Sequence, residues 1–334
     1  MKSIIINKND AGQRLDRFLQ KLCPALPLAL LYKYIRLKRV KLNGKRAEIS
    51  ARLKIGDVLD CYINDEFFSQ PGQGRGALDF LSAGKTLNIV YEDEHILLAD
   101  KPQGLLAHPD DEEFGDTLIG RIKRYLYEKN EYHPGNEQSF TPALCNRIDR
   151  NTGGLVIAAK TAEALRVLNE KIKAREVNKF YLCVVHGKPE KKSDTLHGRL
   201  FKEESKNKVY VSKFGRQERR SGLRSQASNL NGEEKEIVTR YRVLKERDNL
   251  SLLEVELLTG RTHQIRAHLA SIGHPLLGDG KYGVNAADRK RGFKHQALYS
   301  YKLEFMFKSD AGALEYLNGR SFEVKNVWFR GLLD

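Results

Sequence analysis

The sequence predicts an α+β protein in which a small N-terminal α/β domain precedes a large domain built on a mixed, largely antiparallel sheet. Three observations favour this fold class. A basic block with helix-like and hairpin-like patterns occupies residues 1–64, a stretch rich in Gly, Ser, Gln and Pro follows at 65–85, and strand-like runs outnumber helix-like runs over 86–334. These three ranges are the expected small domain, linker and large domain, and 334 residues suffice for them.

The small domain is expected to hold two short helices and a hairpin. Apolar side chains recur at positions i, i+3, i+4 and i+7 in residues 15–22, and residues 28–35 repeat this helical spacing. The stretch "VKLNGKRA" then places Asn43-Gly44, a pair favoured in tight hairpin turns, between two short runs. The three elements together predict a compact platform.

Charge is concentrated in this small domain. The chain carries a net charge of +15, and residues 1–64 contain fourteen lysines and arginines against five acids. Such a surplus indicates a polyanionic partner, either nucleic acid or an anionic membrane surface, although a solvated basic face would have the same composition. The cations expected to contact phosphate lie on the second helix and the hairpin: Lys33, Arg36, Lys38, Arg39, Lys41, Lys45 and Arg46.

Cysteine usage and hydropathy indicate the compartment. The four cysteines lie far apart without C-x-x-C spacing, which disfavours a zinc ribbon and a disulfide framework. The opening "MKSIIINKND" has too few consecutive apolar residues for a signal sequence, and no later apolar run is long enough to span a membrane. We therefore expect a cytoplasmic monomer without a membrane partner.

The sequence of the first part of the large domain predicts several strands and one helix. The stretch "LNIVYEDEHILLADKPQGLLAHP" predicts strand, turn, strand and loop, and "LVIAAK" predicts a buried strand. Thr161 stands at an N-cap position before a helix-like repeat that reaches residue 172. The β-branched and aromatic content of "KFYLCVV" predicts a further strand, with Tyr181 on one face and Phe180 on the other.

The second part is interrupted by a charged segment. Residues 188–236 are irregular in pattern apart from "KVYVSKF", and we expect an exposed insertion or loop there. Strand patterns resume with "EIVTRYRVL" and "LSLLEVELLTG", in which apolar residues alternate with glutamates and so predict a strand buried on one face.

The stretch "NRIDRNTGGL" places an acid between two arginines. Asp149 lies between Arg147 and Arg150, and the two glycines that follow let the chain bend sharply and approach a ligand. A carboxylate exposed on such a loop is a candidate for catalysis. The alternative is a structural salt bridge between Asp149 and a neighbouring arginine.

The stretch "LLTGRTHQIRAHLASIGHPLLGDGKYG" predicts a strand that leads directly into a helix. Thr262 is the expected N-cap, the apolar face includes Ile265, and Gly273 is expected to end the helix. Arg261 falls at the strand-to-helix junction, where a helix N-terminus and a guanidinium together attract a carboxylate or phosphate. Zinc binding by the three histidines of this stretch is disfavoured, because their spacing is not H-E-x-x-H and no cysteine completes a ligand set.

Two sets of motifs resemble known families. In "AGQRLDRFLQKL", "YKYIRLKRVKLNGKRA" and "LKIGDVL" the small domain resembles an RNA-binding module of the ribosomal-protein S-four type. In "KPQGLLAHP", "NRIDRNTGGLVIAAK", "KFYLCVVHG" and "GRTHQIRAHL" the large domain resembles the RluA-type pseudouridine synthases, whose ribosomal RNA branch commonly has such a leading module. The resemblance implies the pseudouridine synthase fold, isomerisation of uridine in structured RNA, and no cofactor or metal.

The resemblance also implies roles for particular residues. By it, Asp149 is the catalytic aspartate, Arg261 is the arginine that pairs with it, and Tyr181 packs on the target base. Tyr181 could equally be a core aromatic with a bonded hydroxyl. Residues near these positions are expected to contact the substrate: Arg147, Asn146, Thr152, Gly153, His108, Thr262, His263 and Gln264.

The family motif usually reads H-R-L-D-x-x-T-S-G. In this chain Asn146, Ile148 and Gly153 stand at the varying positions, so the arginine and the acid are kept and the imidazole is not. Large-subunit ribosomal RNA is the expected substrate, and transfer RNA is the alternative.

Two other functions compete with this one. A glycosidase-like hydrolase needs two facing carboxylates, and Asp279 is the only later candidate for the second. A basic ribosome-assembly or RNA-chaperone protein would use the 149 and 261 clusters only to hold its fold together. If the protein is an isomerase, the Asp149 carboxylate could attack C1′, add to the base or remove a ribose proton.

Overall fold

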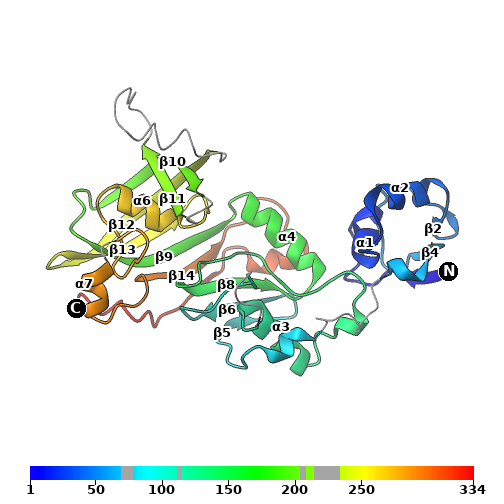
Figure 1. Ribbon diagram of the computed structural model, residues 1–334, viewed down its shortest axis with the longest axis horizontal. Helices are drawn as coiled ribbons and strands as arrows, with labels where there is room; N and C mark the ends of the chain where they lie inside the picture. The colour runs from blue at the N-terminus through cyan, green and yellow to red at the C-terminus, as the bar shows by residue number, and fades with distance from the viewer. Residues whose placement is uncertain (69–77, 111–114, 204–207, 214–233, 284) are drawn as a thin grey trace.

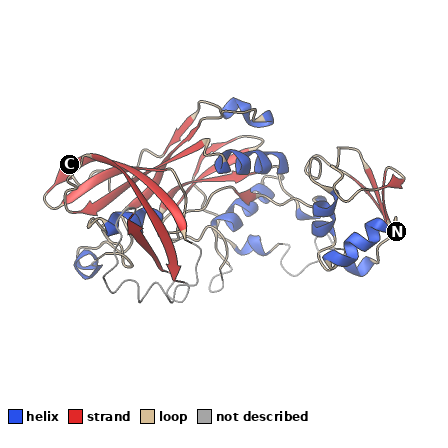
Figure 2. Cartoon of the chain, turned by 90° about the horizontal axis from the view of Figure 1, so that it is seen from above, coloured by secondary structure: helices blue, strands red, loops and turns tan. Residues whose placement is uncertain are grey.

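The computed structural model describes the 334-residue chain except for residues 69–77, 111–114, 204–207, 214–233 and 284. The small domain lies at one end of the molecule in both views, and the large domain forms the rest (Figures 1 and 2). This architecture is the predicted α+β class.

The small domain packs two helices against a four-stranded antiparallel sheet of order β1-β4-β2-β3. Asn43 and Gly44 adopt positive φ angles of 51° and 72°, as a tight hairpin turn between β2 and β3 requires, so the predicted helices and hairpin are confirmed. The elements are β1 (Lys2–Ile5), α1 (Leu15–Leu22), α2 (Leu28–Arg36), β2 (Val40–Leu42), β3 (Lys45–Arg46) and β4 (Val58–Cys61).

The large domain is organised on one sheet of order β11-β10-β12-β13-β9-β14-β8-β6-β5, with β15 and β7 paired at its side. Only the β14–β8 pair is parallel among the described strands, which confirms the predicted, largely antiparallel sheet. The strands are β5 (Ile89–Glu92), β6 (Ile96–Lys101), β7 (Ala143–Leu144), β8 (Gly153–Ala159), β9 (Val177–His186), β10 (Ser193–Glu203), β11 (Lys208–Lys213), β12 (Lys235–Arg247), β13 (Leu250–Leu257), β14 (Leu298–Phe305) and β15 (Ser321–Glu323).

Four α-helices accompany this sheet in the described residues: α3 (Leu118–Glu128), α4 (Ala162–Lys173), α6 (Gln264–Ser271) and α7 (Asn285–Lys290). Thr161 caps α4, because its side chain accepts a hydrogen bond from the Ala164 N–H, as predicted. No described helix is long and apolar enough to cross a membrane.

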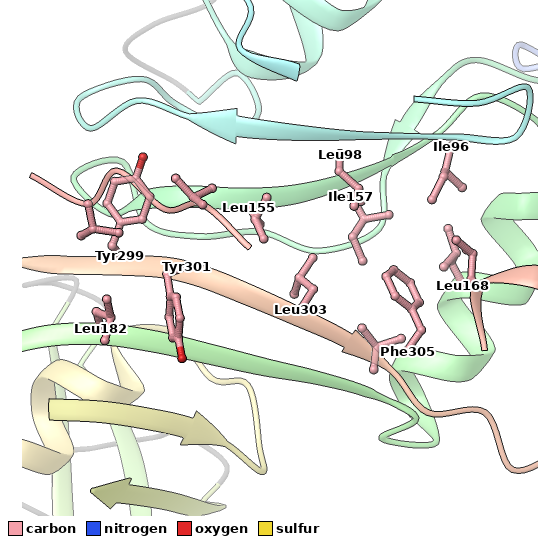
Figure 3. Packing of buried hydrophobic residues seen from close by; sticks show 14 of the residues in the cluster. Ile96, Leu98, Leu155, Ile157, Leu168, Leu182, Tyr299, Tyr301, Leu303 and Phe305 are labelled. Atoms are coloured by element: carbon pink, nitrogen blue, oxygen red, sulfur yellow. The ribbon is translucent and has the colours of Figure 1, made fainter. Parts of the chain in front are cut away.

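The sheet is buried on both faces at its centre, and each face has its own core. On β9, Leu182 and Val184 point into the core covered by α4, whereas Tyr181 and Cys183 point into the core covered by α3 and α6. Figure 3 shows the first core, in which side chains of β6, β8, β9 and β14 interdigitate. Each buried aliphatic side chain contributes roughly 1.5–3 kcal/mol, so this part of the sheet is a rigid base for the loops at its end.

The charged segment at 188–236 is more regular than predicted. Residues Ser193–Glu203 form β10, which pairs with β12 in eight register positions, so the prediction of an irregular insertion was wrong there. Gly198 and Leu200 are buried while Arg199 between them is exposed, and this one-sided burial left too few apolar residues for a strand pattern. Residues 204–207 and 214–233 of the predicted insertion lie outside the described residues.

The two ends of the predicted linker belong to the two domains. Phe68 packs in the core of the small domain, and Phe80 packs against α3 in the core of the large domain. Between them, residues 69–77 lie outside the described residues.

Polar contacts join the two domains. Asn9 donates a hydrogen bond to Glu137 (2.9 Å) and accepts one from the N–H of Ala162 at the start of α4 (3.2 Å). Ser139 donates to the Asp10 carboxylate at 2.7 Å. The small domain is therefore docked on the large one through hydrogen bonds rather than an apolar core.

The glycines after Asp149 serve strand packing. A Cβ on Gly153 would lie 2.4 Å from the Tyr299 ring, and one on Gly154, whose φ is +115°, would lie 2.2 Å from the carbonyl oxygen of Ser300. These glycines begin β8 and allow β14 to approach it in parallel. A close approach of this backbone to a ligand stays a prediction.

Substitution of Gly153 by alanine is expected to lower the free energy of unfolding by about 1–3 kcal/mol. The Tyr299 ring cannot move aside easily, since it is 8% exposed and its hydroxyl donates to Asp100 at 2.6 Å. In a Tyr299→Leu background the same substitution should cost much less. Urea unfolding of the wild type, the two single variants and the double variant measures the coupling between Gly153 and Tyr299. An equal loss of stability from Gly153→Ala in both backgrounds would contradict this coupling.

Candidate active site

Asp149 lies on the loop that leads into β8. The neighbouring Ile148 is buried in the core under α3 and α6, and the N–H of Thr152 donates to the Asp149 carbonyl at 3.0 Å, which closes a tight turn. The Asp149 side chain is 25% exposed, so its carboxylate is open to solvent on a fixed loop.

Arg266, in the first part of α6, connects Asp149 to a second acid. Its Nε and Nη2 atoms donate to the two carboxylate oxygens of Asp279 at 2.8 and 2.9 Å, and its Nη1 donates to Asp149 Oδ2 at 3.2 Å. The two-point contact with Asp279 fixes the plane of the guanidinium, so the third nitrogen is presented to Asp149 in one orientation.

Asp279 is the buried anchor of this group. Its side chain is fully buried, which would raise its pKa, but the hydrogen bonds and charge of Arg266 and the N–H groups of Lys281 and Tyr282 bring the pKa below the ordinary value. Asp279 is therefore ionised and balances most of the Arg266 charge.

Arg261 does not pair with Asp149, and this prediction was wrong. Arg261 is exposed before the helix, and its N–H donates to the side chain of Gln264 at 3.1 Å. The predicted N-cap Thr262 is also wrong: His263 holds that position with φ +55°, and no side chain caps the helix. α6 begins two residues later than Thr262, so the second arginine of the motif, Arg266, lies on the face toward Asp149 and Asp279.

Tyr181 is a buried neighbour of Asp149. It lies on β9 opposite Ser300 of β14 and is 5% exposed. Burial raises the pKa of its phenol to about 12, the Ser300 hydroxyl lowers it, and the charge of Asp149 raises it further. The field of Asp149 thus reaches Tyr181, which remains a neutral phenol at neutral pH.

His263 is a second neighbour of the carboxylate. Its Nε2 is 3.9 Å from Asp149 Oδ2, and its Nδ1 is 3.0 Å from the Tyr282 hydroxyl. Burial lowers the His263 pKa to about 4, although Asp149 acts in the opposite direction, so the ring is neutral at neutral pH. Since the Tyr282 oxygen already accepts from the N–H of Val209, its proton can go to His263 Nδ1, which leaves the imidazole proton on Nε2 facing Asp149.

Lys101 lies under the Asp149 loop and was missed in the sequence. It is fully buried, and its ammonium donates to the carbonyls of Pro102, Leu105 and Arg150 at 3.0, 2.7 and 2.9 Å. Burial lowers its pKa to about 7, and Asp149 raises it. Lys101 therefore joins the loop after β6 to the loop that carries Asp149. The stretch "KPQG" indicates a turn, and its lysine directly follows a run of buried strand residues.

Two surface cavities of about 450 and 510 Å³ lie elsewhere. The first contains the pairs Arg240–Glu256 and Arg242–Glu254, and the second contains Glu92 bound to lysines. Neither Asp149 nor Arg266 lines either cavity, and the paired acids named here are neutralised by their cations.

Comparison with known proteins identifies the family and agrees with the fold. A family model described as RNA pseudouridylate synthase matches residues 95–271. The chain belongs to the RNA pseudouridylate synthase family. A second model, described as S4 domain, matches residues 13–59, so the predicted family and the S-four-type module are confirmed.

Relatives of this synthase match nearly its whole length. An uncharacterized RNA pseudouridine synthase of Mycoplasma capricolum subsp. capricolum is 30% identical, with 98% of both chains covered. Ribosomal large subunit pseudouridine synthase C of Buchnera aphidicola subsp. Acyrthosiphon pisum is 30% identical over 85% of this chain and 82% of its own. In structure, human RNA pseudouridylate synthase domain containing 4 aligns with a TM-score of 0.55 at 21% identity, covering 72% of this chain and 89% of that chain, which shows the shared fold.

Several predicted substrate residues of the synthase have structural partners. Asn146 accepts from the N–H of Ile157 in β8, and Gln264 is buried and donates to Thr239 and to the carbonyl of Val238. The buried Thr152 accepts from Gln296. For these three residues, and for the buried Gly153, the contacts seen hold strands and loops together.

The remaining predicted substrate residues lie at the surface or beside it. Arg147 and Thr262 are exposed. His108 is half-buried, and its Nδ1 is buried without a hydrogen-bond partner in the described part of the chain. Burial first, and then the charges of Arg147 and Lys123, lower the His108 pKa. Arg147 and His108 thus lie close together.

The predicted RNA-contacting cations of the small domain lie on α2, on the turn that follows it and on the β2–β3 hairpin. Lys41 and Arg46 are opposite each other in the hairpin, and Arg39 lies over the Tyr34 ring at 4.9 Å. Within the described residues none of the seven forms a salt bridge, and all except the half-buried Lys41 are exposed: Lys33, Arg36, Lys38, Arg39, Lys41, Lys45 and Arg46.

Proposed function

We propose that this synthase isomerises specific uridines of large-subunit ribosomal RNA, with Asp149 as the catalytic residue. The observation that carries the proposal is the Asp149 carboxylate, which is partly exposed on a rigid loop and held at 3.2 Å by the Arg266 guanidinium. The Arg266 guanidinium gives this carboxylate a charge-assisted hydrogen bond from one fixed direction. An ionised carboxylate is the group that each conceivable route requires.

The reaction is an internal transfer in which atoms balance without a co-reactant. The bond from N1 of uracil to C1′ of ribose breaks, the freed ring turns, and C5 bonds to C1′. The C5 proton leaves, and N1 takes up a proton. Asp149 starts this sequence by attacking C1′, by adding to the base or by removing a ribose proton, and in each route it must be ionised and adjacent to the sugar.

The target nucleotide must leave its stack to reach Asp149. Tyr181 supplies an apolar wall at the base of the site, since its ring belongs to the buried face of β9 and its phenol stays neutral. A neutral His263 with its proton on Nε2 offers a hydrogen-bond donor beside Asp149. The detached uracil would thus be retained between these rings while it turns.

The substrate class is inferred from the relatives and from the basic small domain. Relatives at about 30% identity are named ribosomal large subunit pseudouridine synthases C and D. A surface of unpaired cations supplies affinity for the phosphates of structured RNA without reading its sequence.

A hydrolase is disfavoured by the state of the second acid. Glycoside hydrolysis uses two carboxylates that both reach the substrate. Asp279 is fully buried, and both of its oxygens accept from Arg266. It cannot protonate a leaving group from that position, so internal transfer is the better supported reaction.

A tritium assay tests the function. Large-subunit ribosomal RNA transcribed with uridine labelled at C5 is incubated with the protein, and we expect tritium to appear in water while the uracil stays in the chain. Labelled free uracil would instead indicate hydrolysis. Release of neither product would contradict the proposal and favour a protein that only binds RNA.

Neutralising two cations of the small domain is expected to weaken RNA binding without changing kcat. If Arg36→Gln and Lys45→Gln together remove two phosphate contacts, the slope of log affinity against log salt should become shallower by up to about 1.8. Filter binding over a salt series measures this slope. The matched control is Lys173→Gln with Lys188→Gln, two exposed lysines of the large domain. An equal change in the control would show that net charge, not this surface, determines binding.

A further inference from the structure

An exposed aromatic pair lies at the C-terminal end of the chain. Trp328, the only tryptophan, is 48% exposed. Its ring stacks on Phe293 at 29° with 6.2 Å between centroids, and Phe329 packs edge-on against it at 5.1 Å. One side of the indole is therefore held rigidly while the remainder faces solvent.

The indole is also tied to the loop that carries Asp149. Trp328 Nε1 donates to the side-chain oxygen of Gln103 at 3.0 Å. The Gln103 amide nitrogen donates to the carbonyls of Asn151 and Gln296 at 3.0 and 2.9 Å. Asn151 is two residues after Asp149, so a single side chain, Gln103, separates the indole from the catalytic loop.

The surroundings of the pair are cationic. Phe293 follows α7 closely in the chain, and its ring contact with Trp328 brings the two segments together. The Arg291 guanidinium lies 5.8 Å from the Phe293 ring. Asp288 of α7 is buried, where it binds His186 and the N–H of Gly278. The exposed cations near the pair in sequence are Arg289, Lys290, Arg291, Lys294, Lys325 and Arg330, of which Arg330 is bound to Glu323 at 3.4 Å.

We propose that Trp328 is a stacking platform for a second nucleobase of the substrate RNA, one that flanks the target uridine. This inference rests on the proposed function, because it assumes that RNA lies over Asp149. Unstacked bases of RNA loops are commonly held on exposed aromatic rings bordered by cations. A ring already fixed by a stack and a hydrogen bond loses little entropy when a base binds.

Position and charge favour this occupant over a protein. The cations complement phosphates, and the short connection through Gln103 places the ring within reach of a nucleotide next to the flipped one. Trp328 lies outside residues 95–271, which match the family model, so the platform would be a feature of this chain's C-terminal segment.

The fluorescence of Trp328, the single tryptophan, tests the platform without a substitution of Trp328 itself. The full-length Asp149→Asn protein is titrated with an oligoadenylate of about ten nucleotides, within the usual span of a single-strand groove, and with an abasic ribose-phosphate oligomer of equal length. We expect saturable quenching by the oligoadenylate and none by the abasic oligomer. Equal quenching by both would mean that only charge attracts the RNA. No quenching by either, the result for a protein-binding patch, would also overturn the platform.

Variants extend the test to turnover. On the tritium-labelled ribosomal transcript, Trp328→Ala is expected to raise KM about 5-fold or more at unchanged kcat, as for the loss of one stacked base. Trp328→Phe should bring KM back to within about threefold of wild type, because a ring remains for stacking. A fall in kcat at unchanged KM would mean that the indole only supports the loop through Gln103, and would overturn the platform.

Tyr316→Ala is the matched control for Trp328→Ala. Tyr316 is 42% exposed and its hydroxyl donates to Asp93, so Tyr316→Ala should leave KM within about twofold. A wild-type protein that shows base-dependent quenching but no tritium release would retain the platform and refute the proposed function. Tritium release without quenching, and without an effect of Trp328→Ala on KM, would support the proposed function and refute the platform.

Discussion

Asp149→Asn is expected to lower the rate of tritium release by about 10³-fold or more while RNA still binds. Asparagine has nearly the same shape and keeps a carbonyl acceptor for Arg266, but it has no charge with which to attack C1′, add to the base or remove a proton. Because Arg266 retains both bonds to Asp279, the free energy of unfolding should change by less than about 2 kcal/mol.

On the same transcript, single-turnover kinetics measure the rate of the reaction and filter binding measures the affinity for RNA. Asp149→Glu is the matched control, since it keeps the charge and moves it by one methylene. It should also lose most of the rate, because a displacement of about 1 Å at a reacting group can cost 10²-fold. If the asparagine variant retained a tenth of the wild-type rate, Asp149 would have no part in the chemistry.

Arg266→Ala is expected to reduce both stability and rate. The substitution leaves the fully buried Asp279 without its cation, which typically costs about 3–5 kcal/mol in the free energy of unfolding. It also removes the contact that orients Asp149, so kcat should fall about 10²-fold or more in the fraction that remains folded. Urea unfolding and active-site-normalised tritium release are the two measurements.

Arg261→Ala is the natural comparison, because both arginines belong to "GRTHQIR" and only one reaches Asp149. Arg261 is exposed and has no carboxylate partner in the described residues, so its loss should leave stability within about 0.5 kcal/mol. A folded Arg266→Ala protein with a normal kcat would refute the pairing as a source of activity. A larger kcat loss for Arg261→Ala would return the role to Arg261.

Elements with strong local patterns were predictable from the sequence. The spacing of apolar residues in 15–22 and 28–35 placed both helices of the small domain, and Asn43-Gly44 placed its hairpin. Thr161 is the N-cap of α4 as expected. In each case a few adjacent residues determine the conformation through steric limits or a single local hydrogen bond.

The features that the sequence did not reveal are decided by tertiary contacts. Which arginine meets Asp149 depends on where α6 begins and on the position of Asp279, thirteen residues after Arg266 in the chain. The role of Gly153 depends on Tyr299 in a parallel neighbouring strand. Neither contact leaves a periodic signal in a single sequence.

Lys101 shows what the sequence could have offered. A lysine directly before Pro-Gln-Gly, at the end of a run of buried strand residues, is unusual because burial disfavours its charge. This conflict between a charged side chain and a buried strand indicates a specific set of partners, here three backbone carbonyls. The partners themselves could only be found in the fold.

Mapping pseudouridines in cellular RNA tests the central claim most directly. RNA is compared from cells that lack the protein and from the same cells supplied with the wild-type or the Asp149→Asn protein at equal abundance. The account predicts that at least one pseudouridine of large-subunit ribosomal RNA disappears without the protein, returns with the wild type and stays absent with the variant. Its return with the Asp149→Asn protein would contradict the account.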